Sequence, residues 1–215
     1  MMAKSYNSFT GLKGFKYKVH GKDQEVTSVE NIDYLQEISV SKEQSIEKAY
    51  GDNTVAEMAV SNGTIEVEST FHHLPLEDRV KLFGLLQDED GAVYVGDDTP
   101  PYVSVIFEKT TESGAIEYVG LPKGLFTFPE VEGKTKEDGV EFSQDQSKAE
   151  FMPTDIPGVE GKKAMILGRD EKGSTKMRDA IYKKVFGVDY PGTGGNTEDG
   201  STGGTEQPEE QPAGA

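Results

Sequence analysis

The residues whose types best suit chemistry are two adjacent histidines, His72 and His73, which precede the carboxylates of Glu77 and Asp78. Imidazole and carboxylate groups are common metal ligands, but two ligands of one ion need the spacing i, i+2 on a strand or i, i+4 on a helix. Neighbouring side chains on a strand point to opposite faces. The two histidines therefore cannot chelate one ion from a strand, and we predict no metal site.

A structural role explains the two histidines better. Apolar and polar residues alternate up to Phe71, as in a strand, and Pro75 opens a helical pattern. We therefore expect His72 and His73 to span the corner between a strand and a helix. One ring is expected to pack under the helix and the other to be exposed.

Other catalytic signatures are weak. The chain has no cysteine, which excludes a thiolate nucleophile, a disulfide framework and a sulfur metal site. It has no GxSxG motif, and the segment GRDEKGSTK at 168–176 lacks the GxxxxGK[ST] pattern of a phosphate loop, so we expect a turn that caps the last helix. Paired carboxylates are expected by chance among 39 acidic residues. We predict neither an enzyme nor a cofactor.

The composition fits one domain with a hydrophobic core, because the chain has 215 residues of which 34% are hydrophobic. No apolar run approaches the roughly 20 residues of a membrane span. The first residues also lack the apolar centre of a signal peptide. We therefore expect a soluble protein, made in a cytoplasm, with no membrane partner.

The net charge of −17 is unevenly distributed along the chain. Residues 1–22 carry five lysines and no acid, whereas residues 23–160 carry 30 acids and nine bases. Nucleic-acid binding needs clustered Lys and Arg, so the acidic middle argues against it. A basic end and an acidic body favour head-to-tail association of copies. We expect Lys13, Lys16 and Lys18 to form a basic arm that pairs with acids of a neighbouring copy.

Most of the remaining pattern predicts strands and places two helices near the ends of the ordered part. Ser174 is the expected N-cap of the second helix, and Gly187 is its expected end. The predicted strands begin at Phe15 and cover 32–43, 63–71, 101–110 and 114–131, with a further hairpin around Gln144–Ser147; the predicted helices cover about 75–87, with an apolar stripe of Leu76, Val80, Phe83 and Leu86, and about 174–186.

Two segments lie outside this pattern. Residues 41–60 are long, polar and acidic for a connection between strands, so we predict a projecting loop or an extended hairpin that turns at Tyr50–Asn53. Residues 190–215 are rich in Gly, Thr, Glu and Pro, and we predict a disordered tail there.

The run YGDNTVAEMAVSNGTIEVESTFHHLPLEDRVKLFGLL, from Tyr50 to Leu86, resembles a block in the major tail proteins of long-tailed, non-contractile bacteriophages of Gram-positive hosts. The segments EFSQDQSKAEFMP and GSTKMRDAIYKKVFG resemble later parts of the same family, in the expected order. We therefore place a tail tube domain at residues 1–189 and leave the tail at 190–215 outside the resemblance.

The resemblance implies an α+β, mainly β fold: a β-sandwich or split barrel with one flanking helix, a long projecting loop and a C-terminal helix. It implies a virion structural protein, assembled in the host cytoplasm, whose hexameric rings stack into a tail tube for DNA ejection. The implied partners are other copies, a tape-measure protein in the lumen, and tail terminator and distal tail proteins at the ends. Double-stranded DNA passes through without specific binding, and no enzymatic activity is implied.

Two sets of site residues follow. An acidic wall repels DNA phosphates over a screening length of about 8 Å at physiological salt, so we predict that the face bearing Glu66 and Glu68 lines the lumen. The loop is predicted to contact the adjacent ring through Lys42, Glu43, Glu47, Lys48, Tyr50 and Asp52.

Two other classes stay open on the residues alone. A monomeric carbohydrate- or surface-binding β-sandwich module would use Tyr50, Tyr94, Tyr102 or Tyr118 as its contact platform. A carboxylate-dependent hydrolase would use a pair of acids. Self-assembly of the purified protein into rings or tubes, seen by electron microscopy, would favour the structural hypothesis over both.

Overall fold

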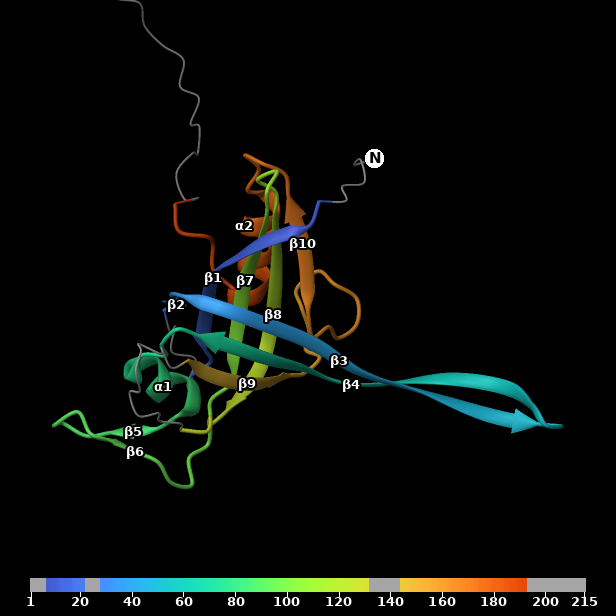
Figure 1. Cartoon of the computed structure of the whole chain (residues 1–215), viewed down its shortest axis with the longest axis horizontal. Coiled ribbons are helices and arrows are strands. Elements are labelled where there is room, and N and C mark those ends of the chain that lie inside the picture. Colours follow the sequence, from blue (N-terminus) through green and yellow to red (C-terminus); the bar gives the residue numbers. More distant parts are fainter. Residues whose placement is uncertain (1–6, 22–27, 132–143, 193–215) are drawn as a thin grey trace, which may run out of the picture.

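The computed structural model describes residues 7–21, 28–131 and 144–192. It is mainly antiparallel sheet with two helices, α1 (Leu76–Phe83) and α2 (Lys176–Phe186), which confirms the predicted fold class (Figure 1). The predicted tail at 190–215 lies almost entirely outside the described residues. The strands are β1 (Phe9–Val19), β2 (Glu30–Ile32), β3 (Leu35–Gly51), β4 (Thr54–Phe71), β5 (Leu86–Gln87), β6 (Val93–Tyr94), β7 (Val103–Thr111), β8 (Ile116–Thr127), β9 (Asp145–Phe151) and β10 (Ile166–Asp170).

The sheet folds over on itself at β8, which belongs to two layers. The first layer contains β2, β1, β7, the first half of β8 and β10, and the second contains the second half of β8, β9, β4 and β3. The strand order is β2-β1-β7-β8-β9-β4-β3, and β10 pairs with the first half of β8. The second half of β8, from Gly124 to Thr127, pairs with β9. Figure 1 shows β3, β4 and β9 crossing β7 and β8 at a steep angle. Gly124 permits the close crossing, because a Cβ there would lie 2.5 Å from the Phe151 ring.

The main core fills the space between the two layers. Alternating residues of β4, including Ile65, Val67 and Phe71, are at most 3% exposed, as their spacing predicts. They face Phe15 and other buried residues of β1, β7 and β8. The helix α1 adds Leu82 and Phe83 to this cluster. Both layers therefore bury one face each against the other.

A second cluster lies on the outer face of the first layer, under α2. Apolar residues of α2 pack against Ile106 and Tyr118, and Gly120 of β8 allows the close approach. Neither helix of the described residues is long and apolar enough to cross a membrane. The buried residues of α2 are Ile181, Tyr182, Val185 and Phe186.

Three sequence predictions need correction. The first helix ends at Phe83, not near residue 87, because Gly84 adopts a left-handed conformation with φ 66°. Leu86 therefore leaves the predicted apolar stripe and is 66% exposed. The hairpin predicted around Gln144–Ser147 is wrong, since Asp145–Phe151 is one continuous strand paired with β4. The strand Ile166–Asp170 had been missed, because a five-residue run gives little periodicity.

The predicted corner between strand and helix is present and is tied to β9 by Asp145. Its carboxylate accepts a hydrogen bond from the Leu74 backbone N–H at 2.8 Å. It also forms an ion pair with Arg79, whose Nη2 lies 2.8 Å away. His73 Nδ1 lies 3.2 Å from the same carboxylate. Burial raises the pKa of Asp145, but the bonds from Leu74 and Arg79 outweigh it and hold the pKa below its ordinary value. The charged carboxylate thus holds the corner.

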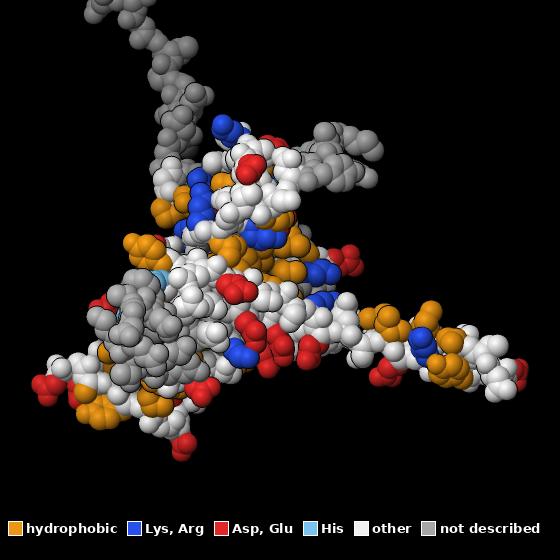
Figure 2. Space-filling view, viewed as in Figure 1, with side chains coloured by type: hydrophobic (Ala, Val, Ile, Leu, Met, Phe, Trp, Pro, Cys, Tyr) orange, Lys and Arg blue, Asp and Glu red, His pale blue; other side chains and the backbone are white. Residues whose placement is uncertain are grey.

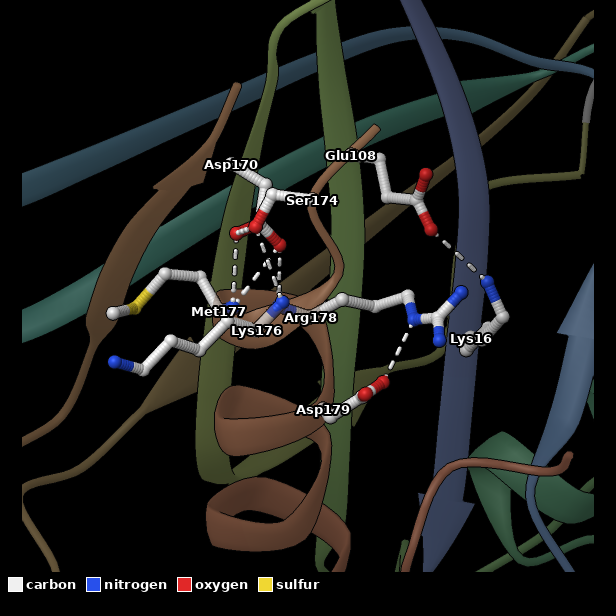
Figure 3. Close-up of polar contacts among 8 residues, drawn as sticks. All are labelled: Lys16, Glu108, Asp170, Ser174, Lys176, Met177, Arg178 and Asp179. Carbon is white, nitrogen blue, oxygen red and sulfur yellow. Dashed lines mark hydrogen bonds and ion pairs between the residues drawn. The ribbon is translucent and has the colours of Figure 1, made fainter. Parts of the chain in front are cut away.

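The helix α2 is capped by a residue that the sequence reading did not assign. Thr175 occupies the N-cap position without a side-chain bond, so Ser174 is not the N-cap residue. Instead the Asp170 carboxylate, 4% exposed, accepts bonds from the backbone N–H groups of Met177 and Arg178 at 3.0 Å (Figure 3). Ser174 Oγ donates to the same carboxylate at 2.8 Å. Gly187 ends the helix, as predicted.

We predict that Asp170→Asn destabilises the fold by about 1.5–3 kcal/mol, the range for hydrogen bonds to a charged group. Burial raises the pKa of Asp170, but the hydrogen bonds from Arg178, Met177 and Ser174 outweigh it and hold the pKa below its ordinary value. The carboxylate therefore stabilises the protein above about pH 4, and this contribution is lost as the pH falls through the lowered pKa. Urea unfolding of wild type and variant at pH 7 and pH 3 measures both effects.

The matched control is Asp189→Asn, which makes the same change at an exposed carboxylate beyond the other end of α2, where the partner Lys183 is also exposed. Equal unfolding free energies for wild type and Asp170→Asn at pH 7 would contradict the assigned cap.

Candidate functional site

The described residues do not group their ionisable side chains as a catalytic or metal centre does. His72 and His73 are both exposed, so the expectation that one ring packs under the helix is wrong. Leu74, which is fully buried, occupies that position instead. Within residues 7–21, 28–131 and 144–192, no three His, Asp or Glu side chains gather closely enough to hold a metal ion.

One exposed surface is the outward face of the β3-β4-β9 layer, which we call the acidic face. Glu66 and Glu68 alternate with the core residues of β4 and are exposed, as predicted. The strand register sets Ser41 and Glu150 beside Glu66, and Ser39 and Lys148 beside Glu68. Figure 2 shows acidic side chains gathered below these strands. The acidic face comprises Glu37, Glu66, Glu68 and Glu150 with the single base Lys148, among Ser39, Ser41 and Gln146.

The single lysine of the acidic face is neutralised by its neighbour. Lys148 Nζ donates to Glu68 Oε1 at 2.5 Å, and this hydrogen bond raises the pKa of Lys148. Both side chains are largely exposed, so the pair adds little to stability. It leaves Glu37, Glu66 and Glu150 as excess negative charge on the face.

The outer face of the first layer, formed by β7 and β8, differs from the acidic face. It is covered by α2, whose apolar residues pack on β7 and β8. There Lys16 pairs with Glu108 at 3.4 Å, next to the side chain of Arg178 (Figure 3). A covered face of this kind cannot present a continuous wall to solvent, whereas the acidic face can.

The predicted projecting loop is an extended hairpin formed by the outer halves of β3 and β4. All residues from Ser41 to Gly63 are exposed, and Figure 1 shows the hairpin reaching far from the sandwich. Its turn lies at Asp52 and Asn53, whose φ angles of 50° and 62° suit a two-residue hairpin turn. The turn therefore falls within the predicted Tyr50–Asn53.

The two faces of the hairpin differ sharply, which the sequence reading did not notice. Ile46 pairs with Val60, Lys48 with Met58, and Tyr50 with Val55, so these side chains share one face. We call this set the hairpin stripe. Ile46, Tyr50, Met58 and Val60 are 57–69% exposed and Val55 is 45% exposed. The opposite face carries Ser45, Glu47, Ala49, Glu57, Ala59 and Ser61.

The predicted loop residues all lie on this hairpin, but on different faces. Lys48 and Tyr50 belong to the hairpin stripe, and Glu47 lies on the opposite face. Lys42 Nζ donates to Asn62 Oδ1 at 2.8 Å near the base, and Asp52 forms the turn. Glu43 lies where the register shifts between the strands. Single apolar residues alternate with polar ones along this segment, so its sequence has a polar average although one face is apolar.

The three N-terminal lysines lie on β1, which is paired with β2 on one side and β7 on the other. Their side chains have contacts within their own chain. Lys13 and Lys16 lie 3.8 and 3.4 Å from Glu108. Lys18 Nζ donates to the Phe186 carbonyl at the end of α2, at 2.8 Å. They do not form a free arm, and their pairing with acids of a neighbouring copy stays a prediction.

The four tyrosines of the alternative binding module do not form one platform. Tyr118 is 3% exposed and packs under α2. Tyr50 lies near the hairpin tip and Tyr94 on β6, at opposite ends of the molecule (Figure 1). A flat sugar-stacking surface needs its aromatic rings side by side, so this arrangement disfavours that hypothesis.

The β3-β4-β9 layer has unpaired strand margins on both sides. In the described residues β3 pairs with β4 alone, and β8 from Leu125 to Thr127 pairs with β9 alone. Unpaired margins expose a row of backbone N–H and C=O groups that readily pair with another chain. The same layer thus combines an exposed acidic face with two open edges.

Comparison with protein families finds that residues 9–190 match the model of the family described as phage tail tube protein. A search of curated proteins finds no match. The family match covers the whole described fold from β1 to the end of α2, including both margins and the hairpin.

We predict that deleting Glu47–Thr54 changes the unfolding free energy of the unassembled protein by no more than about 0.5 kcal/mol. The removed residues are exposed and lie outside both core clusters. Chemical unfolding at a dilution that prevents association measures this. Phe71→Ala on the same strand is the positive control, with an expected loss of about 3–5 kcal/mol. A comparable loss in the deletion variant would show that the hairpin supports the fold.

Proposed function

Since the chain belongs to the phage tail tube protein family, a family of non-enzymatic structural components of the virion tail, we propose that its copies close into hexameric rings. The rings stack into the hollow tube of a long, non-contractile tail of a phage of a Gram-positive host. The tube conducts DNA during ejection. A tape-measure protein fills the lumen before ejection, and tail terminator and distal tail proteins bind the two ends.

The observation that carries this proposal concerns the β3-β4-β9 layer. Among the described residues, the strands at both of its margins have one side without a paired strand, and one of its faces is exposed to solvent. When β3 of one copy pairs with the free edge of β8 in the next, the layers join into one sheet. Repetition of this heterologous contact with a closing rotation gives a ring without free edges. The sandwich core stays on the outside of the resulting barrel and supports it.

The acidic face is then the wall of the lumen. Glu37, Glu66 and Glu150 repel DNA phosphates, and Lys148 is already occupied by Glu68. Repulsion acts within the screening length of about 8 Å at physiological salt. DNA therefore slides through without adhering, which a conduit requires.

The hairpin is the contact between rings. Its residues are exposed in one copy and include five large apolar side chains on one face. Burial of apolar area contributes about 25 cal/mol per Å², so covering this stripe favours stacking. The apolar face continues the core side of β3 and β4, whereas the face with Glu47 and Glu57 continues the acidic face.

We predict that the double variant Glu66→Lys, Glu68→Lys assembles into normal tubes but slows or blocks DNA ejection. The substitutions replace repulsion with attraction for phosphates and bring two lysines next to Lys148. Phage particles carrying the variant are compared with wild type by DNA release and by electron microscopy of their tails. The control Glu112→Lys, Glu160→Lys makes the same charge change at exposed positions away from the acidic face. Unchanged ejection from variant particles would refute the lumen assignment.

We further predict that the protein lacking Glu47–Thr54 forms rings but not tubes. Its folded sandwich and margins are intact, but the hairpin loses its tip together with Lys48 and Tyr50 of the hairpin stripe. Negative-stain electron microscopy and sedimentation distinguish the two assemblies. Tubes of normal length from the deletion variant would exclude the hairpin as the inter-ring contact.

A further inference from the structure

The hairpin stripe needs a complementary surface, because its apolar side chains project from both strands with nothing from their own chain above them. Ile46 is 63% exposed, Met58 64% and Val60 57%. Lys48 lies in the middle of the stripe, opposite Met58. An acceptor must therefore be apolar at its centre and supply negative charge within reach of one ammonium group.

The small sheet β5-β6 has this composition. Leu86 of β5 pairs with Tyr94 of β6, and Val95 follows. Their side chains are 66%, 54% and 60% exposed. We call these three residues the β5-β6 patch. Figure 2 shows apolar side chains at this end of the molecule, with acidic groups around them.

Three of the acids around the β5-β6 patch are available for an external cation. Asp88 is already used, because its carboxylate accepts bonds from the Ala92 backbone and from the Tyr94 hydroxyl at 2.8 Å. Those bonds shape the turn. Glu89 and Asp90 at the tip of the turn, and Asp97 beyond β6, are exposed. In the described chain, the three form no ion pair, and neither does Lys48.

The two surfaces lie at opposite ends of the molecule's longest axis. Figure 1 shows the hairpin tip at one end and β5-β6 at the other. Complementary patches at opposite ends produce a head-to-tail contact that repeats from copy to copy.

We propose that the hairpin stripe of one copy docks on the β5-β6 patch of a copy in the next ring, with Lys48 reaching the acids at 89, 90 and 97. This names the acceptor for the inter-ring contact and rests on the proposed tube. The occupant is a second copy of the same chain. Apolar contact supplies the attraction, and the single cation fixes the register along the stripe.

The chain has no cysteine, so paired substitutions report this contact without background. One variant carries Met58→Cys on the hairpin stripe, and a second carries Leu86→Cys on the patch. The two proteins are mixed, assembled and mildly oxidised, and disulfide-linked dimers are detected by non-reducing electrophoresis and located by mass spectrometry. We expect a cross-link between the two variants that appears with tube formation. The matched control is Ala59→Cys with Leu86→Cys, which places the thiol on the opposite face of the hairpin.

A charge exchange tests the same contact without a covalent bond. Lys48→Glu alone should reduce tube formation at least tenfold while leaving rings, because a carboxylate then faces Glu89, Asp90 and Asp97. Lys48→Glu combined with Glu89→Lys and Asp90→Lys should restore tubes. The reference variant Lys42→Glu changes the same charge near the base of the hairpin, outside the stripe, and should assemble normally.

The outcomes separate this proposal from the proposed function. Tubes that show the Met58–Leu86 cross-link and respond to the charge exchange support both. Tubes that form normally but cross-link equally through Ala59, or not at all, overturn the docking site and leave the tube intact. A protein that forms neither rings nor tubes under any condition overturns the proposed function and the docking site with it.

Discussion

The structure depends on a sheet whose hydrogen-bond pairing is incomplete within one chain. Folding the sheet over at β8 buries one face of each layer in a common core, but among the described residues it leaves β3 and Leu125–Thr127 of β8 with one unpaired side each. Exposed strand margins are a liability in a monomer. In the proposed ring they would pair with each other and close the sheet, so the feature that makes an isolated chain prone to association would set the geometry of the assembly.

The two faces of the same layer differ: one is buried in the core and the other is acidic and exposed. Period-two alternation sends Ile65 and Val67 into the core and Glu66 and Glu68 to solvent. The alternation of β3 continues into the hairpin, and the register shift between Ile65 and Asn62 of β4 keeps Met58 and Val60 opposite its core-side positions. The core side therefore becomes an apolar stripe, and the acidic side stays polar and acidic. One pair of strands thus carries a core face and a charged face and, in the proposed tube, also supplies the contact between rings.

The sequence predicted what local periodicity governs and missed what depends on distant contacts. The alternation in β4, the buried side of α2, and the corner at His72 and His73 all follow from nearby residues. The N-cap was misassigned because the Asp170 carboxylate comes from a strand before the helix and folds back over its first turn. The extent of α1 depended on one conformation, that of Gly84. The apolar stripe went unnoticed because its members come from two strands and meet only when the register is known.

Electron cryo-microscopy of the self-assembled protein tests the central claim most directly. The account predicts hollow tubes built from six-membered rings, with β3 of one copy paired to β8 of its neighbour and with Glu66 and Glu68 facing the bore. A protein that stays monomeric at every concentration and salt level, or tubes in which those two side chains face outward, would contradict it.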